Sequence, residues 1–261
     1  MYRKKNSVLF IIILEICINC LSVKCGRVKR VVGAVDVDCG TQPRVASLLN
    51  STSQQHMCGA TILSPHYALT AAHCVLCDEH EYILQLNNFC ISDGAEVPRA
   101  TILEIIRHKL YDPITKAHDV AVLRISLHLC DTSWLKDTLL PTSMFGMSGE
   151  CTLYGYGYTD LDAKETSERL LAGAVKIVSL DECREALGPS VAPDYDMGMI
   201  CAVGDGVDAC QGDSGSPLIC SGQIEAISSY GMSCAVPDLP GVYVSVAAHL
   251  PWIRRMMECH K

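Results

Sequence analysis

The chain contains ten short runs of apolar and β-branched residues, separated by turn residues such as Gly, Pro, Ser and Asp. Short runs at this spacing are typical of the strands of an all-β sandwich or of a pair of β-barrels. The runs span residues 44–49, 60–63, 82–86, 101–108, 120–125, 151–157, 174–178, 216–220, 224–231 and 241–246. They predict an all-β fold.

Only the C-terminal segment has a helical pattern. Residues 251–259 begin with a proline, which suits the first turn of a helix, and carry four apolar side chains on one face. These side chains are Trp252, Ile253, Met256 and Met257. A segment rich in Pro, Gly and Ser at residues 137–150 marks a boundary between two halves of similar size.

The N-terminus has the layout of a secretory signal peptide. Three basic residues at positions 3–5 precede an apolar run from Val8 to Leu14. The alternative is a membrane anchor, but Glu15 interrupts the run, which is far shorter than the roughly 20 apolar residues that a spanning helix needs. We therefore expect residues 1–22 to be a signal peptide and the protein to be secreted.

A dibasic pair follows the leader. Lys29 and Arg30 precede Val31 and further small, apolar residues, which predicts proteolytic processing after Arg30 and a propeptide at residues 23–30. The alternative is a basic linker. The significance of this site depends on what the new Val31 amine would contact.

The chain has sixteen cysteines. In a secreted protein these favour disulfides, whereas a cytosolic chain would suggest metal binding. One segment, HCVLCDEH, has zinc-like ligand spacing, but no second pair with matching spacing occurs elsewhere, so we predict no metal and no cofactor. Its candidate ligands are His73, Cys74, Cys77 and His80.

The charge excludes one class of partner. Residues 1–30 hold seven of the 21 Lys and Arg residues and one of the 29 acidic residues, so the remainder has 14 basic and 28 acidic residues, a formal net charge of −14. This balance opposes nucleic-acid binding and favours attraction of cationic peptides. A solvated acidic surface without a specific partner is the alternative.

Three segments carry the residue types of nucleophilic catalysis. They are LTAAHC with His73, HDVAVLRI with Asp119, and DACQGDSGSPL with Ser214. Taken singly, they suggest a structural histidine, a charge at a strand end and a tight turn between glycines. Together, and in the chain order His, Asp, Ser, they resemble the chymotrypsin/trypsin-like serine proteases from Val31 to about Trp252. The α/β-hydrolase motif G-x-S-x-G fails, since Ser216 occupies its last position.

The resemblance implies two six-stranded antiparallel β-barrels, at about 31–138 and 139–261, with the active site between them. It implies that Ser214 is the nucleophile, His73 its general base and later acid, and Asp119 the group that orients His73. The backbone N–H groups of Gly212 and Ser214 would form the oxyanion hole.

The resemblance also assigns the two other acids near Ser214. Asp213 would pair with the Val31 amine after cleavage at Arg30, so that the precursor is an inactive zymogen. Asp208 would lie at the base of the primary specificity pocket and select Arg or Lys substrates. Ser229, Gly231 and Gly241 would line this pocket. Asp205 is a rival acid, which we interpret as a solvated loop charge.

The family pattern implies four disulfides: Cys58–Cys74, Cys151–Cys220, Cys183–Cys201 and Cys210–Cys234. Removal of the signal peptide and propeptide would leave an odd number, thirteen cysteines, so we expect Cys25 to keep the propeptide attached by a disulfide. Cys77 with Cys90 is a plausible local pair. No pairing is assigned to Cys39, Cys130 and Cys259.

Several positions depart from the family pattern: Ala60, Tyr156, Leu187, Ser216 and Tyr230. Of these, Leu187 is expected to loosen specificity, because it supports the pocket from behind. The expected partners are protein or peptide substrates with Arg or Lys, an activating protease and protease inhibitors, with the protein itself a monomer that binds no membrane. A non-catalytic binding protein is the rival reading. Asn50 begins a sequon that is either glycosylated or unused.

Overall fold

The structure is a computed structural model that describes residues 34–37, 44–86, 97–129, 132, 135, 139–142, 149–160, 165–232, 234, 236 and 238–259. The predicted signal peptide, propeptide, Arg30 and Val31 lie outside these residues. Four of the cysteines discussed above also do: Cys25, Cys39, Cys90 and Cys130.

The first half of the chain forms a closed six-stranded antiparallel barrel in the order β2-β3-β4-β7-β6-β5. Its strands are β2 (Val45–Asn50), β3 (His56–Ser64), β4 (Tyr67–Thr70), β5 (Tyr82–Leu86), β6 (Arg99–Arg107) and β7 (Ala121–Leu127). In β5, the sequence YILQL alternates between buried and half-buried positions, as expected for a strand with one face toward a core. Leu48, Ile62, Leu84 and Leu123 fill the barrel interior.

The second half forms another closed barrel, because β8 pairs with both β13 and β11. Its strands are β8 (Glu150–Gly155), β11 (Leu171–Val178), β12 (Met199–Val203), β13 (Pro217–Cys220), β14 (Gln223–Tyr230) and β15 (Gly241–Ser245). A small two-stranded sheet of β9 (Tyr158–Asp160) and β10 (Glu165–Thr166) lies outside the barrels. The two barrels confirm the predicted fold class.

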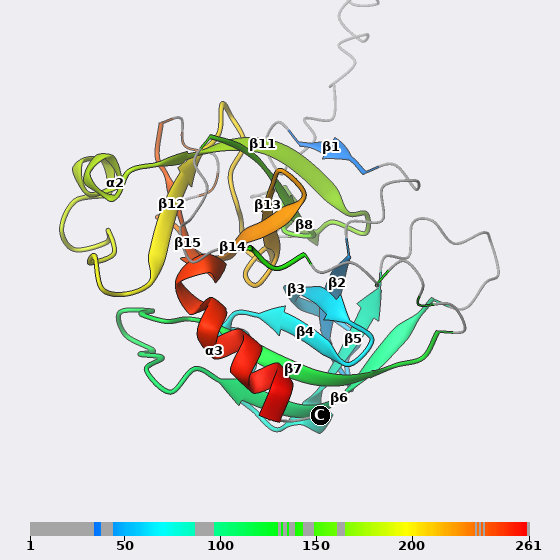
Figure 1. The fold of residues 1–261 in the computed structure, drawn as a ribbon. Coiled ribbons are helices and arrows are strands. Elements are labelled where there is room, and N and C mark those ends of the chain that lie inside the picture. Colours follow the sequence, from blue (N-terminus) through cyan, green and yellow to red (C-terminus); the bar gives the residue numbers. More distant parts are fainter. Residues whose placement is uncertain are drawn as a thin grey trace, which may run out of the picture.

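The first described strand belongs to the second barrel. β1 (Val35–Asp36) pairs with β11 at Ala172 and Leu171 and lies beside β11 in Figure 1. Its residues therefore extend the second barrel, although they fall within the range assigned to the first. This pairing brings the segment that follows the predicted cleavage site to the barrel that carries Ser214.

Two α-helices occur in the described residues, where the sequence predicted one. Helix α2 (Leu180–Leu187) was missed, although Ser179 and Glu182 form a capping box at its start. Helix α3 (Val246–Cys259) begins five residues before the predicted start, and Pro251 lies inside it. The reason is that the Ser245 hydroxyl accepts a hydrogen bond from the Ala248 N–H at 3.2 Å, which caps the helix one turn earlier.

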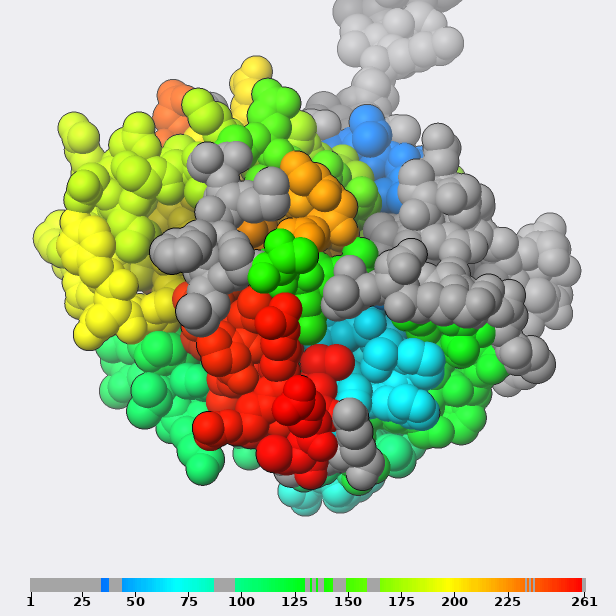
Figure 2. Space-filling model, viewed as in Figure 1, coloured from blue at the N-terminus to red at the C-terminus, as the bar shows by residue number. Residues whose placement is uncertain are grey.

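Helix α3 joins the two barrels. Its residue Leu250 packs in a single buried cluster with Leu69 and Val122 from the first barrel and with Ile227 and Val244 from the second. In the space-filling view, α3 (red) covers the surface where the cyan and green residues of the first barrel meet the yellow residues of the second (Figure 2). Among the described residues, no helix has the length and apolarity needed to cross a membrane.

Candidate active site

His73 lies on a short 3₁₀ turn, η1 (Ala72–Cys74), that directly follows β4 and its buried link residue Ala71. The Cys58–Cys74 disulfide ties this turn to β3, with the two Cα atoms 6.2 Å apart. The local sequence therefore holds the imidazole at the edge of the first barrel, where its side chain is 20% exposed.

Asp119 lies in the loop before β7 and is fully buried. Its Oδ2 is 2.6 Å from His73 Nδ1 and accepts a hydrogen bond from the Ser229 hydroxyl, also at 2.6 Å. Its Oδ1 accepts the backbone N–H of His73 at 2.9 Å. Burial acts to raise the pKa of Asp119. The net pKa is nevertheless lowered, because the hydrogen bonds and charge of His73 and the hydrogen bond from Ser229 outweigh the effect of burial. The carboxylate is thus ionised and oriented toward the imidazole.

Ser214 lies between β12 and β13, in a loop that two glycines allow to turn sharply. Gly212 has φ +97° and Gly215 has φ +81°, both in the region that favours glycine. The Gly59 N–H donates to the Ser214 carbonyl at 2.8 Å, which anchors the loop to the first barrel. Within the described residues, the Ser214 hydroxyl donates to the Ser229 carbonyl at 3.3 Å and makes no hydrogen bond to the His73 ring. Ser214 and His73 line the same pocket, of about 200 Å³.

The backbone around Ser214 offers two unused donors. Neither the Gly212 N–H nor the Ser214 N–H donates to any described residue. Buried or half-buried N–H groups are normally paired. Two free donors on one turn can therefore both donate hydrogen bonds to a ligand oxygen. The Gly212 carbonyl is held from the other side by His56 Nε2 at 2.8 Å.

His56 was not predicted as a site residue. Its Nδ1 lies 2.6 Å from the Ser47 hydroxyl, so a chain of polar contacts runs from β2 through β3 to the Gly212 carbonyl. Burial lowers the pKa of His56, and the Gly212 contact acts in the opposite direction. Ser47 and His56 lie on the two strands of the β2–β3 hairpin, but no local spacing marks them as site residues, because the Gly212 carbonyl that His56 contacts lies 156 positions away.

Asp213 is also fully buried, with backbone donors on both carboxylate oxygens. The Gly157 N–H donates to Oδ1 at 2.7 Å and the Cys210 N–H donates to Oδ2 at 2.8 Å. A Cβ on Gly155 would lie 1.8 Å from Oδ1, so only glycine fits against this carboxylate. Burial raises the pKa of Asp213 to about 7, the two N–H groups oppose this shift, and the charge of Asp208 adds to it.

Asp208 lies at the other side of the same loop with 7% exposure. Its Oδ1 would lie 3.1 Å from a Cβ on Gly241, and the hydroxyl of Tyr243 would lie 3.2 Å from that same Cβ. The Tyr243 hydroxyl is buried without a hydrogen-bond partner among the described residues. Burial, followed by the charges of Asp208 and Asp213, raises the pKa of Tyr243 well above its usual value. Ser229 and Gly231 line the adjoining pocket of Ser214.

The structure contains the four disulfides expected from the family pattern. Cys74 is therefore bonded to Cys58, and its sulfur is not available to a metal in the HCVLCDEH segment. Cys77 and Cys259 are exposed and have no disulfide partner among the described residues.

The structure shows what two of the residues that depart from the family pattern, Ser216 and Leu187, contact. Ser216 is fully buried, and its hydroxyl occupies the space where a Cβ on Gly59 would lie, at 1.9 Å. Leu187, at the end of α2, is buried in the cluster against which Tyr230 packs. The Tyr230 hydroxyl reaches the Val191 carbonyl at 3.1 Å, so this wall of the pocket rests on the α2 region.

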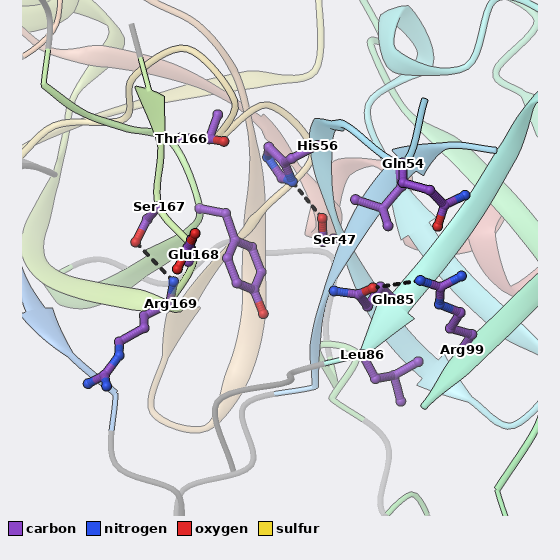
Figure 3. A pocket seen from close by; sticks show the side chains of 12 residues that line it. Ser47, Gln54, His56, Gln85, Leu86, Arg99, Thr166, Ser167, Glu168 and Arg169 are labelled. Atoms are coloured by element: carbon purple, nitrogen blue, oxygen red, sulfur yellow. Dashed lines mark hydrogen bonds between the residues drawn. The ribbon is translucent and has the colours of Figure 1, made fainter. Parts of the chain in front are cut away.

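A larger pocket, of about 520 Å³, lies beside the Gly212 loop, away from Ser214. Figure 3 shows Thr166 to Arg169 on one side of it, and Ser47, Gln85 and Arg99 from the first barrel on the other. His56, which holds the Gly212 carbonyl, lines its end. Its lining is polar and carries both signs of charge.

Comparisons with known proteins agree with this geometry. The family model described as Trypsin matches residues 31–253. Trypsin II-P29 of Gallus gallus is 30% identical over 210 residues, which cover 80% of this chain and 82% of that protein. Trypsin-2 of Salmo salar is 28% identical over 233 residues, covering 88% and 96% respectively. The solved structure of neuropsin, a serine protease expressed in the limbic system of mouse brain, superposes with a TM-score of 0.71 at 26% identity and covers 86% of this chain and 98% of that one.

Proposed function

Because the chain belongs to the trypsin family of serine proteases, we propose that it is a secreted endopeptidase, made as a precursor, that cleaves peptide bonds after Arg or Lys. The observation that carries this proposal is the 2.6 Å contact between His73 Nδ1 and the buried Asp119, in a pocket that also contains Ser214. Four disulfides support an extracellular location.

The proposed chemistry is acyl transfer. Asp119 keeps the Nδ1–H of His73 pointed at itself, which leaves the Nε2 lone pair to accept the Ser214 proton. The Ser214 oxygen then bonds to the peptide carbonyl carbon, and the carbonyl oxygen takes the negative charge. The free N–H groups of Gly212 and Ser214 receive this oxygen. His73 returns the proton to the departing amine, and water hydrolyses the acyl-enzyme by the same steps.

The contact from Ser214 to Ser229 is compatible with this role. The 3.3 Å hydroxyl-to-carbonyl contact is longer than the usual O–H···O range of about 2.5–3.0 Å, and rotation about the Cα–Cβ bond of Ser214 redirects the oxygen. Catalytic hydrogen bonds are often long without substrate and shorten in the substrate complex.

Specificity would come from the buried base of the pocket. Asp208 supplies a negative charge there, and the Tyr243 hydroxyl supplies an unused hydrogen-bonding group beside it. A long cationic side chain would satisfy both, whereas a neutral apolar one would leave them desolvated.

Activation would work through Asp213. The buried Asp213 carboxyl, whose pKa is raised to about 7, has no compensating cation among the described residues, and an amine freed at Val31 would supply one. We propose that an activating protease cuts after Arg30, and that Cys25 keeps the propeptide attached by a disulfide.

The test measures hydrolysis of chromogenic peptides with Arg, Lys or Phe before the scissile bond, after N-terminal sequencing confirms Val31. We expect hydrolysis of the Arg and Lys peptides, none with Ser214→Ala, and loss of the Arg/Lys preference with Asp208→Ser. Asp205→Ser is the matched control and should retain the preference. If no peptide is cleaved although Val31 is the N-terminus, the protein is a non-catalytic binder.

A further inference from the structure

Three histidines meet outside the catalytic pocket, where α3 crosses the first barrel. His108 directly follows β6, His118 directly precedes Asp119, and His249 lies in the first turn of α3. One ring nitrogen from each lies within 4.8 Å of the other two. The ring centroids are 4.9, 5.1 and 5.2 Å apart, so the three imidazoles surround one point.

The hydrogen bonds of His249 assign its protons. Its Nδ1 is 2.7 Å from the Ser245 carbonyl, which can only accept, so Nδ1 carries the hydrogen. In the neutral ring, Nε2 is then a bare lone pair directed at His118 Nδ1, 2.9 Å away. Histidines that bind metals usually donate their other N–H to a carbonyl or carboxylate in this way, which orients the ring.

The backbone at Gly198 approaches the rings so closely that no side chain fits there. Gly198 has φ +67°, and a Cβ there would lie 2.4 Å from His249 Cε1 and 3.4 Å from His118 Nδ1. The backbone N–H of His118 donates to the Met197 carbonyl at 3.0 Å. The Trp252 ring packs edge-on against the His108 ring, with their centroids 4.7 Å apart. The backbone and neighbouring rings thus position the cluster.

Two of the three rings, those of His108 and His249, have lowered pKa values. Burial, followed by the charges of His249 and His118, lowers the pKa of His108 to about 4. Burial also lowers the pKa of His249, and the Ser245 contact opposes this.

We propose that His108, His118 and His249 form a binding site for a divalent transition-metal ion, for which Zn²⁺ is the best match. Zn–N bonds of about 2.0–2.1 Å place tetrahedral ligands roughly 3.3 Å apart, between the 2.9 Å contact and the 4.8 Å limit in the cluster. Ca²⁺ and Mg²⁺ prefer oxygen ligands and do not suit three imidazoles.

Binding requires one internal change. His118 moves its proton from Nδ1 to Nε2, so that the Nδ1 and His249 Nε2 lone pairs both face the metal and no net proton is released. His108 and His118 are only partly buried, so the ion and a fourth ligand, water, can reach the site. Because His118 precedes Asp119 and His249 lies on α3, the ion would connect the catalytic loop to the C-terminal helix.

The test is calorimetric titration of the chain with ZnCl₂ after chelation of adventitious metal and alkylation of free thiols. The Ser214→Ala variant is used to prevent self-cleavage. We expect one Zn²⁺ per chain, with binding at least tenfold weaker in His108→Ala and in His118→Asn. His80→Ala, in the HCVLCDEH segment, is the control and should bind Zn²⁺ like the parent.

Circular dichroism would verify that each variant is folded. In a separate test, Co²⁺ bound in place of Zn²⁺ should give the visible absorption of a tetrahedral site only when all three histidines are present. The proposal is overturned if the parent binds no Zn²⁺. It is also overturned if both cluster variants bind Zn²⁺ as tightly as the parent, or if only His80→Ala weakens binding. None of these outcomes depends on peptide hydrolysis.

Discussion

Asp119 and Asp213 are both fully buried, yet their carboxyl groups respond in opposite ways. The pKa of Asp119 is lowered, because His73 and Ser229 provide enough hydrogen bonds and charge to exceed the effect of burial. Burial raises the pKa of Asp213 to about 7 and the charge of Asp208 adds to the shift, because the two backbone N–H donors found among the described residues do not outweigh burial. Burial alone therefore does not determine the protonation state.

The difference indicates two kinds of functional site. The partners of Asp119 belong to the folded barrels and are present as soon as the chain folds. Asp213 is complete only when a cation arrives, and the proposed cation is an amine that proteolysis creates. A fold can thus hold one carboxylate ready for catalysis and a second one ready for activation.

Among the variants that test this difference between the two carboxylates, Asp119→Asn should have the largest effect on activity. The amide cannot accept the His73 Nδ1–H and the Ser229 hydroxyl as a carboxylate does, so His73 adopts the wrong tautomer. We expect kcat on an Arg peptide to fall by about 10⁴-fold with little change in KM. Steady-state kinetics measure this, and a loss of less than tenfold would contradict the role of Asp119.

Asp213→Asn should have the next largest effect. The Val31 amine would lose its counter-charge, and the donors of Gly212 and Ser214 would not be set in place. We expect kcat/KM of the cleaved protein to fall by about 10²- to 10³-fold, the usual effect of impairing an oxyanion donor. N-terminal sequencing must show Val31 in both proteins. Equal activity of the variant and the parent would argue against Asp213 as the activation switch.

The smallest effect concerns the stability of the uncut precursor. With a folded pKa of about 7 against an ordinary value of 3.8, Asp213 retains a proton that the unfolded chain has released. Its contribution to stability is therefore complete below about pH 4 and is lost as the pH rises through about 7. Relative to the Asp213→Asn precursor, the precursor should lose stability between about pH 4 and about pH 7.

Urea unfolding in a Ser214→Ala background, where no self-cleavage occurs, would measure this difference. Asp208→Asn should shift the transition to lower pH, because it removes the charge that helps to raise the pKa of Asp213. Parallel pH profiles for the two precursors would mean that Asp213 is already paired before cleavage.

The secondary structure was predictable where periodicity decided it. Strand β5 matches its predicted range because buried and half-buried positions alternate along it. Helix α2 and the start of α3 were missed, because their signals were capping residues rather than apolar periodicity. Ser179 and Ser245 provide those caps.

The sequence by itself determined the chemical groups: an imidazole, a carboxylate and a hydroxyl in a family-specific order, with glycines on both sides of the hydroxyl where the backbone turns sharply. Only the tertiary structure decided which groups meet. Packing of the two barrels brings His56, which Ser47 contacts, to the Gly212 carbonyl, and docking of α3 brings His249 to His108 and His118. These contacts join residues up to 156 positions apart, so no local pattern can encode them.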